Sequence, residues 1–128
     1  MKKKEKLKIK NLIDRYKEHA EFLGMDLLDV NQPGSVDDTM LHIAARKGNI
    51  EDIYILISVG ANINAIGDLG NTPLHQAAMR GTFDSVKVLL EMNANPLIKN
   101  EFGQTAADVA RIGKYFGIYE LIKEYIKE

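Results

Sequence analysis

The chain has 128 residues, of which 45% are hydrophobic, and it contains no cysteine. We expect one soluble globular domain without disulfides or thiolate metal ligands, and the absence of a ~20-residue apolar run or a signal-peptide segment predicts a cytoplasmic protein. The net charge of −1 divides into +5 in residues 1–10 and −6 in the remaining 118, and an acidic body is a poor match for a nucleic-acid backbone.

Six lysines fill the first ten residues, and positive charge at a helix N-terminus opposes the helix dipole. We therefore predict that residues 1–6 form a basic, disordered, solvated tail. Contact with nucleic acid or an anionic membrane is the alternative use of this charge, and we expect neither partner.

Apolar residues at helical spacing follow the tail and predict an amphipathic helix within residues 7–24, with Gly24 as its candidate end. They are Ile9, Leu12, Ile13, Tyr16, Ala20, Leu23 and Leu27. Two interpretations of residues 7–31 stay open. In the first, these residues form a degenerate copy of the repeat that follows, with Leu23 in the place of Leu56. In the second, they form one continuous helix.

A segment that begins with threonine recurs twice at steps of 33 residues, without a gap. Each threonine can cap a helix, and Gly48 and Gly81 can end the first two such helices in the left-handed conformation. A second apolar stripe follows with the spacing of one helix face. The copies start with Thr39-Met40-Leu41-His42, Thr72-Pro73-Leu74-His75 and Thr105-Ala106-Ala107-Asp108. The predicted helix pairs are 39–47 and 50–59, 72–80 and 83–91, and 105–112 and 116–127.

The first and third copies depart from the second. Asp37 stands where the later copies have Gly70 and Gly103, so the loop between Gln32 and Asp38 is predicted to depart from their hairpin shape. The third copy is more polar, and we interpret its last helix as a C-terminal cap that faces water. The substituting residues are Asp108, Arg111, Lys114 and Lys123, and Tyr119, Ile122 and Ile126 form the apolar side of that helix.

The pattern Gly70-Asn71-Thr72-Pro73-Leu74-His75, with Gly81, Leu89-Leu90 and Ala94 in phase, resembles the signature of the ankyrin-repeat family over residues 31–128. The resemblance implies an all-α solenoid of stacked helix-turn-helix units with N- and C-terminal capping helices. The cap would span 7–31 and the repeats 34–66, 67–99 and 100–128. It further implies a protein-protein interaction module, monomeric by itself, that binds a macromolecular partner through its concave face and uses no cofactor.

His42 and His75 invite a metal hypothesis that the geometry of such a stack disfavours. Equivalent residues of adjacent repeats lie about 8–10 Å apart, whereas zinc binds nitrogen at about 2.0–2.1 Å. The resemblance implies that each histidine bonds its capping threonine and a neighbouring loop, so we predict a structural role and no metal site. No catalytic motif is present either, and we predict no enzyme activity and no catalytic residue.

Positions that the repeat framework leaves free are the candidate partner contacts. Leu69 and Phe102 each stand three residues before a capping threonine, so stacking should make them neighbours, while Met79 and Arg80 end an inner helix beside them. Apolar loop residues next to an arginine are typical of interface centres. The predicted partner-binding residues are Arg46, Lys47, Asp68, Leu69, Asn71, Met79, Arg80, Glu101 and Phe102, with Arg46, Lys47, Asp68 and Glu101 as a polar rim.

Two other classes of function remain open. The chain could be a small structural or assembly subunit. It could also be an effector or inhibitor that enters a host cell by a non-classical route, since its 13 lysines against 4 arginines are typical of AT-rich genomes.

Overall fold

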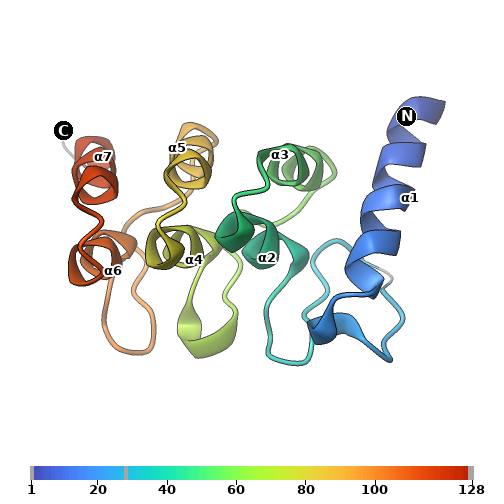
Figure 1. The fold of residues 1–128 in the computed structure, drawn as a ribbon, viewed down its shortest axis with the longest axis horizontal. Coiled ribbons are helices and arrows are strands. Elements are labelled where there is room, and N and C mark those ends of the chain that lie inside the picture. The colour runs from blue at the N-terminus through green and yellow to red at the C-terminus, as the bar shows by residue number, and fades with distance from the viewer. Residues whose placement is uncertain (1, 28, 127–128) are drawn as a thin grey trace.

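The structure is a computed structural model that describes residues 2–27 and 29–126 (Figure 1). No strand occurs within these ranges, which confirms the all-α prediction. The elements are α1 (Lys3–Lys17), η1 (Ala20–Phe22), α2 (Met40–Lys47), α3 (Ile50–Ser58), η2 (Asp68–Gly70), α4 (Pro73–Arg80), α5 (Phe83–Glu91), α6 (Ala106–Ile112) and α7 (Phe116–Ile126). The six repeat helices match the predicted ranges within one residue, and Lys127 lies outside the described residues.

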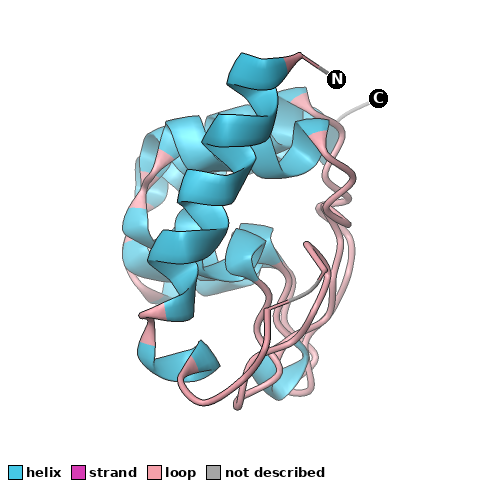
Figure 2. Cartoon of the chain, turned by 90° about the vertical axis from the view of Figure 1, so that its right-hand side faces the viewer, coloured by secondary structure: helices cyan, strands magenta, loops and turns pink. Residues whose placement is uncertain are grey.

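The repeat helices stand in two rows (Figure 1). The inner row is α2, α4 and α6, and the outer row is α3, α5 and α7, so each repeat contributes one helix to each row. The loops between repeats gather along one side of the helices (Figure 2). The concave face is the surface between these loops and the exposed sides of the inner helices.

Each repeat begins and ends through the same local chemistry. Thr72 caps α4 because its hydroxyl accepts a hydrogen bond from the His75 N–H at 3.2 Å, and Pro73 occupies the first helical position, where no N–H is needed. Gly48 and Gly81 end α2 and α4 with φ of 73° and 72°, the left-handed conformation predicted for them.

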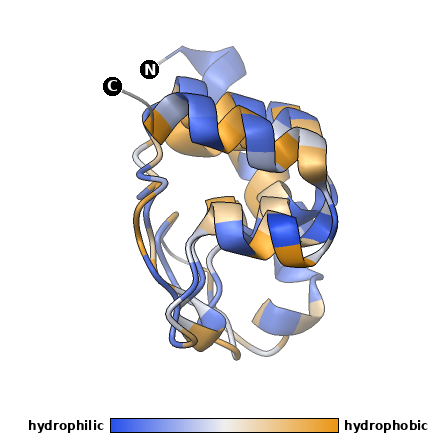
Figure 3. Ribbon diagram, turned by 90° about the vertical axis from the view of Figure 1, so that its left-hand side faces the viewer, coloured by the Kyte–Doolittle hydropathy of each residue, from blue (hydrophilic) through white to orange (hydrophobic). Residues whose placement is uncertain are grey.

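The core runs through the whole stack from α1 to α7. Leu41, Leu74 and Leu89 are buried, and the alanines at 44–45 and 77–78 are fully inaccessible. Side chains this small let α2 pack directly against α4. Seen from the α6–α7 end, both helices alternate hydrophilic and hydrophobic bands (Figure 3). None of the described helices is long and apolar enough to cross a membrane.

The first hairpin loop keeps the shape of the other two, so the predicted departure was wrong. The loops close through equivalent hydrogen bonds: Gly34 N–H to the Asp38 carbonyl at 2.8 Å, Gly67 N–H to the Asn71 carbonyl at 2.9 Å, and Asn100 N–H to the Gln104 carbonyl at 2.9 Å. Asp37 has a φ of 70°, close to those of Gly70 and Gly103. Aspartate tolerates the left-handed region better than most residues, which is why it can replace glycine here.

The predicted amphipathic N-terminal helix is present and buries Leu12 and Tyr16, but its bounds differ from the predicted ones. α1 begins at Lys3, so residues 3–6 are helical and do not form a disordered tail. Glu5 in the first turn and Arg15 and Lys17 in the last turn suit the helix dipole and offset the adverse lysines. α1 ends at Lys17, well before Gly24, and Leu23 is exposed where Leu56 is buried. The segment is therefore not one continuous helix. It departs from the repeat in its helices but joins the repeat phase at its end, where the Asn31 side chain accepts a hydrogen bond from the Asn62 N–H as that of Asn64 does from the Asn95 N–H.

Two polar networks attach this segment to the stack. The buried Asp52 carboxylate on α3 accepts hydrogen bonds from the Arg15 guanidinium at 2.7 and 3.0 Å and from the Tyr16 hydroxyl at 3.0 Å. Arg46 on α2 pairs with Glu21 of η1 and, at 2.8 Å, with Asp38 of the first hairpin. Leu12, Phe22 and Leu27 add apolar anchors.

Candidate partner-binding surface

A hollow of about 300 Å³ lies on the concave face between the loops and the ends of the inner helices. It brings together six of the nine predicted residues: Arg46, Asp68, Leu69, Asn71, Met79 and Arg80. Glu21, Val36, Asp38 and Gln76 complete its lining. Lys47, Glu101 and Phe102 lie outside this lining.

The apolar centre of the surface comes from two adjacent loops and one helix end. Leu69, Met79 and Phe102 are 47%, 43% and 66% exposed, which leaves three large apolar side chains facing solvent. The Leu69 carbonyl accepts a hydrogen bond from the Glu101 N–H at 3.0 Å, so the loops that carry Leu69 and Phe102 lie side by side, as stacking predicts. Exposed apolar groups that gather in this way are a mark of interaction sites.

The close approach of these loops depends on Gly70. Its φ is 76°, and a Cβ atom there would lie 2.8 Å from the Glu101 nitrogen. Leu69 itself has a φ of 56°, in the left-handed region that a leucine rarely adopts. Both conformations hold the tip of the second loop against the third.

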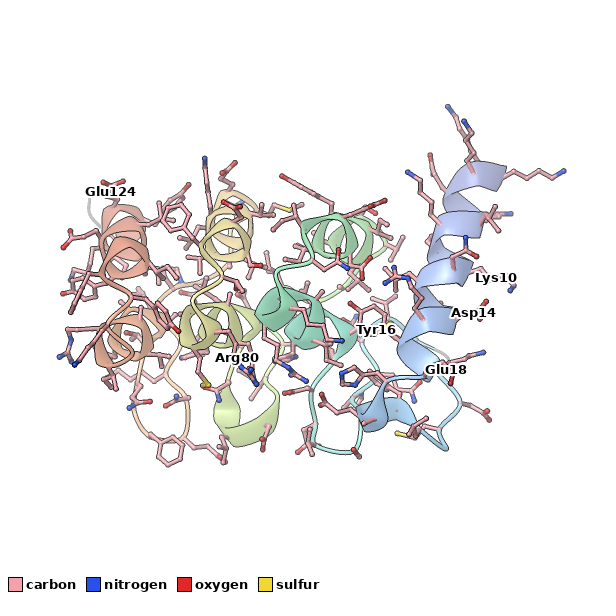
Figure 4. The ribbon with its side chains drawn as sticks, viewed as in Figure 1. Lys10, Asp14, Tyr16, Glu18, Arg80 and Glu124 are labelled. Carbon is pink, nitrogen blue, oxygen red and sulfur yellow. The ribbon has the colours of Figure 1, made fainter. Side chains whose placement is uncertain are left out.

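Arg80 supplies an uncompensated positive charge beside the apolar centre. It ends α4, is exposed, and lies on the loop side of that helix (Figure 4). Among the described residues its guanidinium makes no hydrogen bond or ion pair. Arginine next to apolar side chains is enriched at the energetic centres of protein interfaces.

Three residues predicted as partner contacts, Arg46, Lys47 and Asn71, are not free side chains at the centre of this surface. Arg46 is held by Glu21 and Asp38, so it joins α2 to η1 and the first hairpin and is not a free rim residue. Lys47 lies in a separate hollow beside α1, with Arg15 and Tyr16, because it points to the other side of α2.

Asn71 is only 4% exposed, since it belongs to the loop framework. Its Oδ1 accepts a hydrogen bond from Asn100 at 3.0 Å and its carbonyl accepts one from His42 at 2.8 Å. The side chain is therefore already used in joining the second and third loops, which corrects its assignment as a partner contact.

The histidines have the structural role predicted for them. Nδ1 of His42 accepts a hydrogen bond from the Thr39 N–H at 3.0 Å, and Nε2 donates one to the Asn71 carbonyl at 2.8 Å. His75 repeats this arrangement with Thr72, at 3.1 Å, and the Gln104 carbonyl, at 2.8 Å. These partners require the neutral imidazole with its proton on Nε2. Burial lowers the pKa of both histidines.

Sequence reasoning missed the part of the hollow that Glu21 lines. This side chain is buried, its Oε2 pairs with Arg46, and its Oε1 has no hydrogen-bond partner in the described residues. Glu21 lies in η1, outside the 33-residue phase, so no repeat position pointed to it.

Comparison with known proteins agrees with this geometry. No curated protein shows significant similarity to the chain. A family model described as ankyrin repeats, in three copies, matches residues 10–100 and again residues 41–126. These matches span the three helix pairs and about half of α1, and the chain therefore belongs to the ankyrin-repeat family.

Proposed function

We propose that this chain is a protein-binding module whose partner contacts the concave face around Leu69, Met79, Arg80 and Phe102. The observation that carries the proposal is the hollow in which Leu69 and Met79 are exposed next to the guanidinium of Arg80, which is not paired with any described residue. The repeat framework buries Leu41, Leu74 and Leu89 and leaves Leu69, Met79 and Phe102 outside the core. Their exposure has no role in stabilising the fold.

The surroundings of the centre favour a polar rim. Asp68 and Glu101 are exposed at the loop tips, and Phe102 extends the apolar area onto the third loop. Interfaces of this composition place apolar anchors and arginine at the middle and charged groups at the edge. Single anchors of this kind contribute at least about 2 kcal/mol to binding.

The test begins with affinity purification of the intact chain and identification of the bound proteins by mass spectrometry. The double variant Leu69→Ser with Phe102→Ser should then bind the identified partner at least about tenfold more weakly, a loss of roughly 1.4 kcal/mol. Both side chains are exposed, so circular dichroism and the denaturation midpoint should remain unchanged.

A matched control removes one exposed aromatic and one exposed aliphatic side chain elsewhere. Tyr54 on α3 and Leu97 after α5 are suitable, and Tyr54→Ser with Leu97→Ser should leave the affinity unchanged. Loss of binding in this control, with full binding in the first variant, refutes the concave-face assignment.

A further inference from the structure

The tips of the three hairpin loops share one composition. We call them the tip ridge: residues 35–37, 68–70 and 101–103. Each tip carries one exposed large apolar residue and one exposed acidic residue: Val36 and Asp37, Leu69 and Asp68, Phe102 and Glu101. The ridge contains no lysine or arginine. Three stacked tips therefore form a row with three exposed apolar and three exposed acidic side chains.

The acidic side chains of the ridge are not used by the fold. The backbone N–H of Asp68 donates to the Asp38 carboxylate at 3.0 Å, and that of Glu101 donates to the Leu69 carbonyl at 3.0 Å. The carboxylates of Asp37, Asp68 and Glu101 make no hydrogen bond or ion pair with any described residue. Substituting these side chains would leave the backbone hydrogen bonds of the loops in place.

Three basic residues lie near the ridge in the structure or in the sequence, and none of them belongs to it: Arg46, Arg80 and Lys99. Arg46 is shared by Glu21 and Asp38, so this group of three charges remains net negative. Lys99, which precedes the third tip, is exposed. Arg80 stands back from the tips, on the helix wall of the hollow. The charged side chains of the tips themselves are therefore all negative, at the outer edge of the concave face.

We propose that the partner docks a basic segment along the tip ridge, with lysine or arginine opposite Asp37, Asp68 and Glu101 and apolar side chains on Val36, Leu69 and Phe102. This inference rests on the proposed function and adds the chemistry of the partner. Adjacent repeats are roughly 10 Å apart, close to the span of three residues in an extended segment or seven in a helix. Contacts should recur in the segment at one of those spacings.

The test selects phage-displayed random dodecapeptides on the immobilised full chain at low salt. The enriched peptides should be net positive with apolar residues between the bases, and their synthetic forms should bind in solution. Asp68→Lys with Glu101→Lys should weaken their binding at least about tenfold. The effect should shrink near 1 M salt, where the screening length falls to about 3 Å.

The matched control makes the same change of net charge on the outer row. Glu91 on α5 and Glu124 on α7 are exposed, and Glu91→Lys with Glu124→Lys should leave peptide binding within about twofold of the original. Equal weakening in the two charge variants would mean that only the total charge matters, and it would overturn the tip ridge as the site.

The remaining outcomes separate this inference from the proposed function. Peptides that need Leu69 and Phe102 but are neutral or acidic overturn the basic partner and leave the concave-face site standing. Peptides that bind equally to Leu69→Ser with Phe102→Ser, or no enrichment at all, contradict the site itself. The chain could also self-associate in a way that Asp68→Lys with Glu101→Lys abolishes. That result would mean that the ridge binds the lysines of a second copy, and it would overturn the inference of a separate partner.

Discussion

The second repeat and the N-terminal segment of residues 2–27 are held in the structure by different means. The second repeat depends on local contacts that recur: Thr72 caps α4, His75 bonds the next loop, and Gly81 ends the helix. The N-terminal segment depends on single long-range contacts, above all Arg15 and Tyr16 with Asp52. Periodic parts can thus be recognised by phase, whereas singular parts cannot.

This difference also sets how each region should respond to damage. A repeat shares its apolar core with both neighbours, so a defect there should weaken the whole stack. α1 packs against α3 at one edge of the stack. A defect in its attachment should release α1 and leave the repeats folded.

The largest effect is expected from Leu74→Ala in α4. Leu74 is fully buried between the inner helices, and emptying such a site costs roughly 2–5 kcal/mol of unfolding free energy. Urea denaturation followed by circular dichroism should show one transition at a lower midpoint, because so few repeats unfold as a unit. The control is Leu97→Ala, the same change at an exposed position, with an expected loss of less than about 0.5 kcal/mol.

Asp52→Ala should have the next largest effect and a different pattern. It removes the acceptor of the buried Tyr16 hydroxyl, and leaving such a group unpaired costs about 1–3 kcal/mol. Arg15 is largely exposed and regains water, so its lost ion pair adds little. Hydrogen exchange should show faster amide exchange in α1 with protection in α4 and α5 retained.

Glu51, which is exposed and adjacent to Asp52, provides the control for the hydrogen-exchange experiment. Glu51→Ala removes a carboxylate one residue away without touching Tyr16, and α1 should keep its protection. Equal loss of protection across α1, α4 and α5 in Asp52→Ala would mean that the N-terminal segment and the repeats form one cooperative unit, and that the contrast between them is wrong.

The same contrast explains what the sequence could predict of the fold. Threonine caps, left-handed glycines and alanine pairs report local backbone states, so six helices were placed within one residue. α1 was misplaced because lysines 3–6 suggested an unfavourable dipole, while the compensating Glu5 and the anchors on α3 lie outside any local rule. The first hairpin was misjudged because aspartate can adopt the φ of glycine.

The candidate site divides along the same line. Leu69 was grouped with Phe102 by phase, and Met79 and Arg80 were added because they end the inner helix that follows. Leu69, Met79 and Arg80 line the same hollow. Arg46 and Asn71 were predicted to be free surface residues. The position of a residue in the repeat indicates its direction, but it does not indicate which side chains lie next to it. Their partners, Glu21 and Asn100, come from a segment outside the repeat and from the next loop.

The buried histidines predict a loss of stability in mild acid. The pKa of each histidine is lower in the folded chain than in the unfolded chain. Between the two pKa values the unfolded chain binds more protons, so the stability falls as the pH drops below about 6.5. The slope is at most about 1.4 kcal/mol per pH unit for each histidine. The unfolding free energy obtained from denaturation curves should be lower at pH 5 than at pH 7 by more than about 1 kcal/mol.

His19 of the N-terminal segment also has a lowered pKa and acts with the same sign, whereas Asp108 loses its stabilising charge only at lower pH. His75→Gln therefore removes one of the two deeply buried titrating groups, and the pH dependence should become shallower in this variant. A slope that is unchanged would mean that His75 does not contribute to the loss of stability in mild acid.

The smallest effect is expected from Thr72→Ala. The hydroxyl of Thr72 accepts the His75 N–H, and its loss should cost about 1 kcal/mol, as for other helix caps. The Thr72 N–H still donates to Nδ1 of His75, so the imidazole keeps its bond to the Gln104 carbonyl and the loops stay joined. Thr72→Ser should recover most of the stability, because serine offers the same acceptor. A loss as large as that of Leu74→Ala would show that the cap also holds His75 in place, and that the periodic contacts of a repeat are themselves coupled.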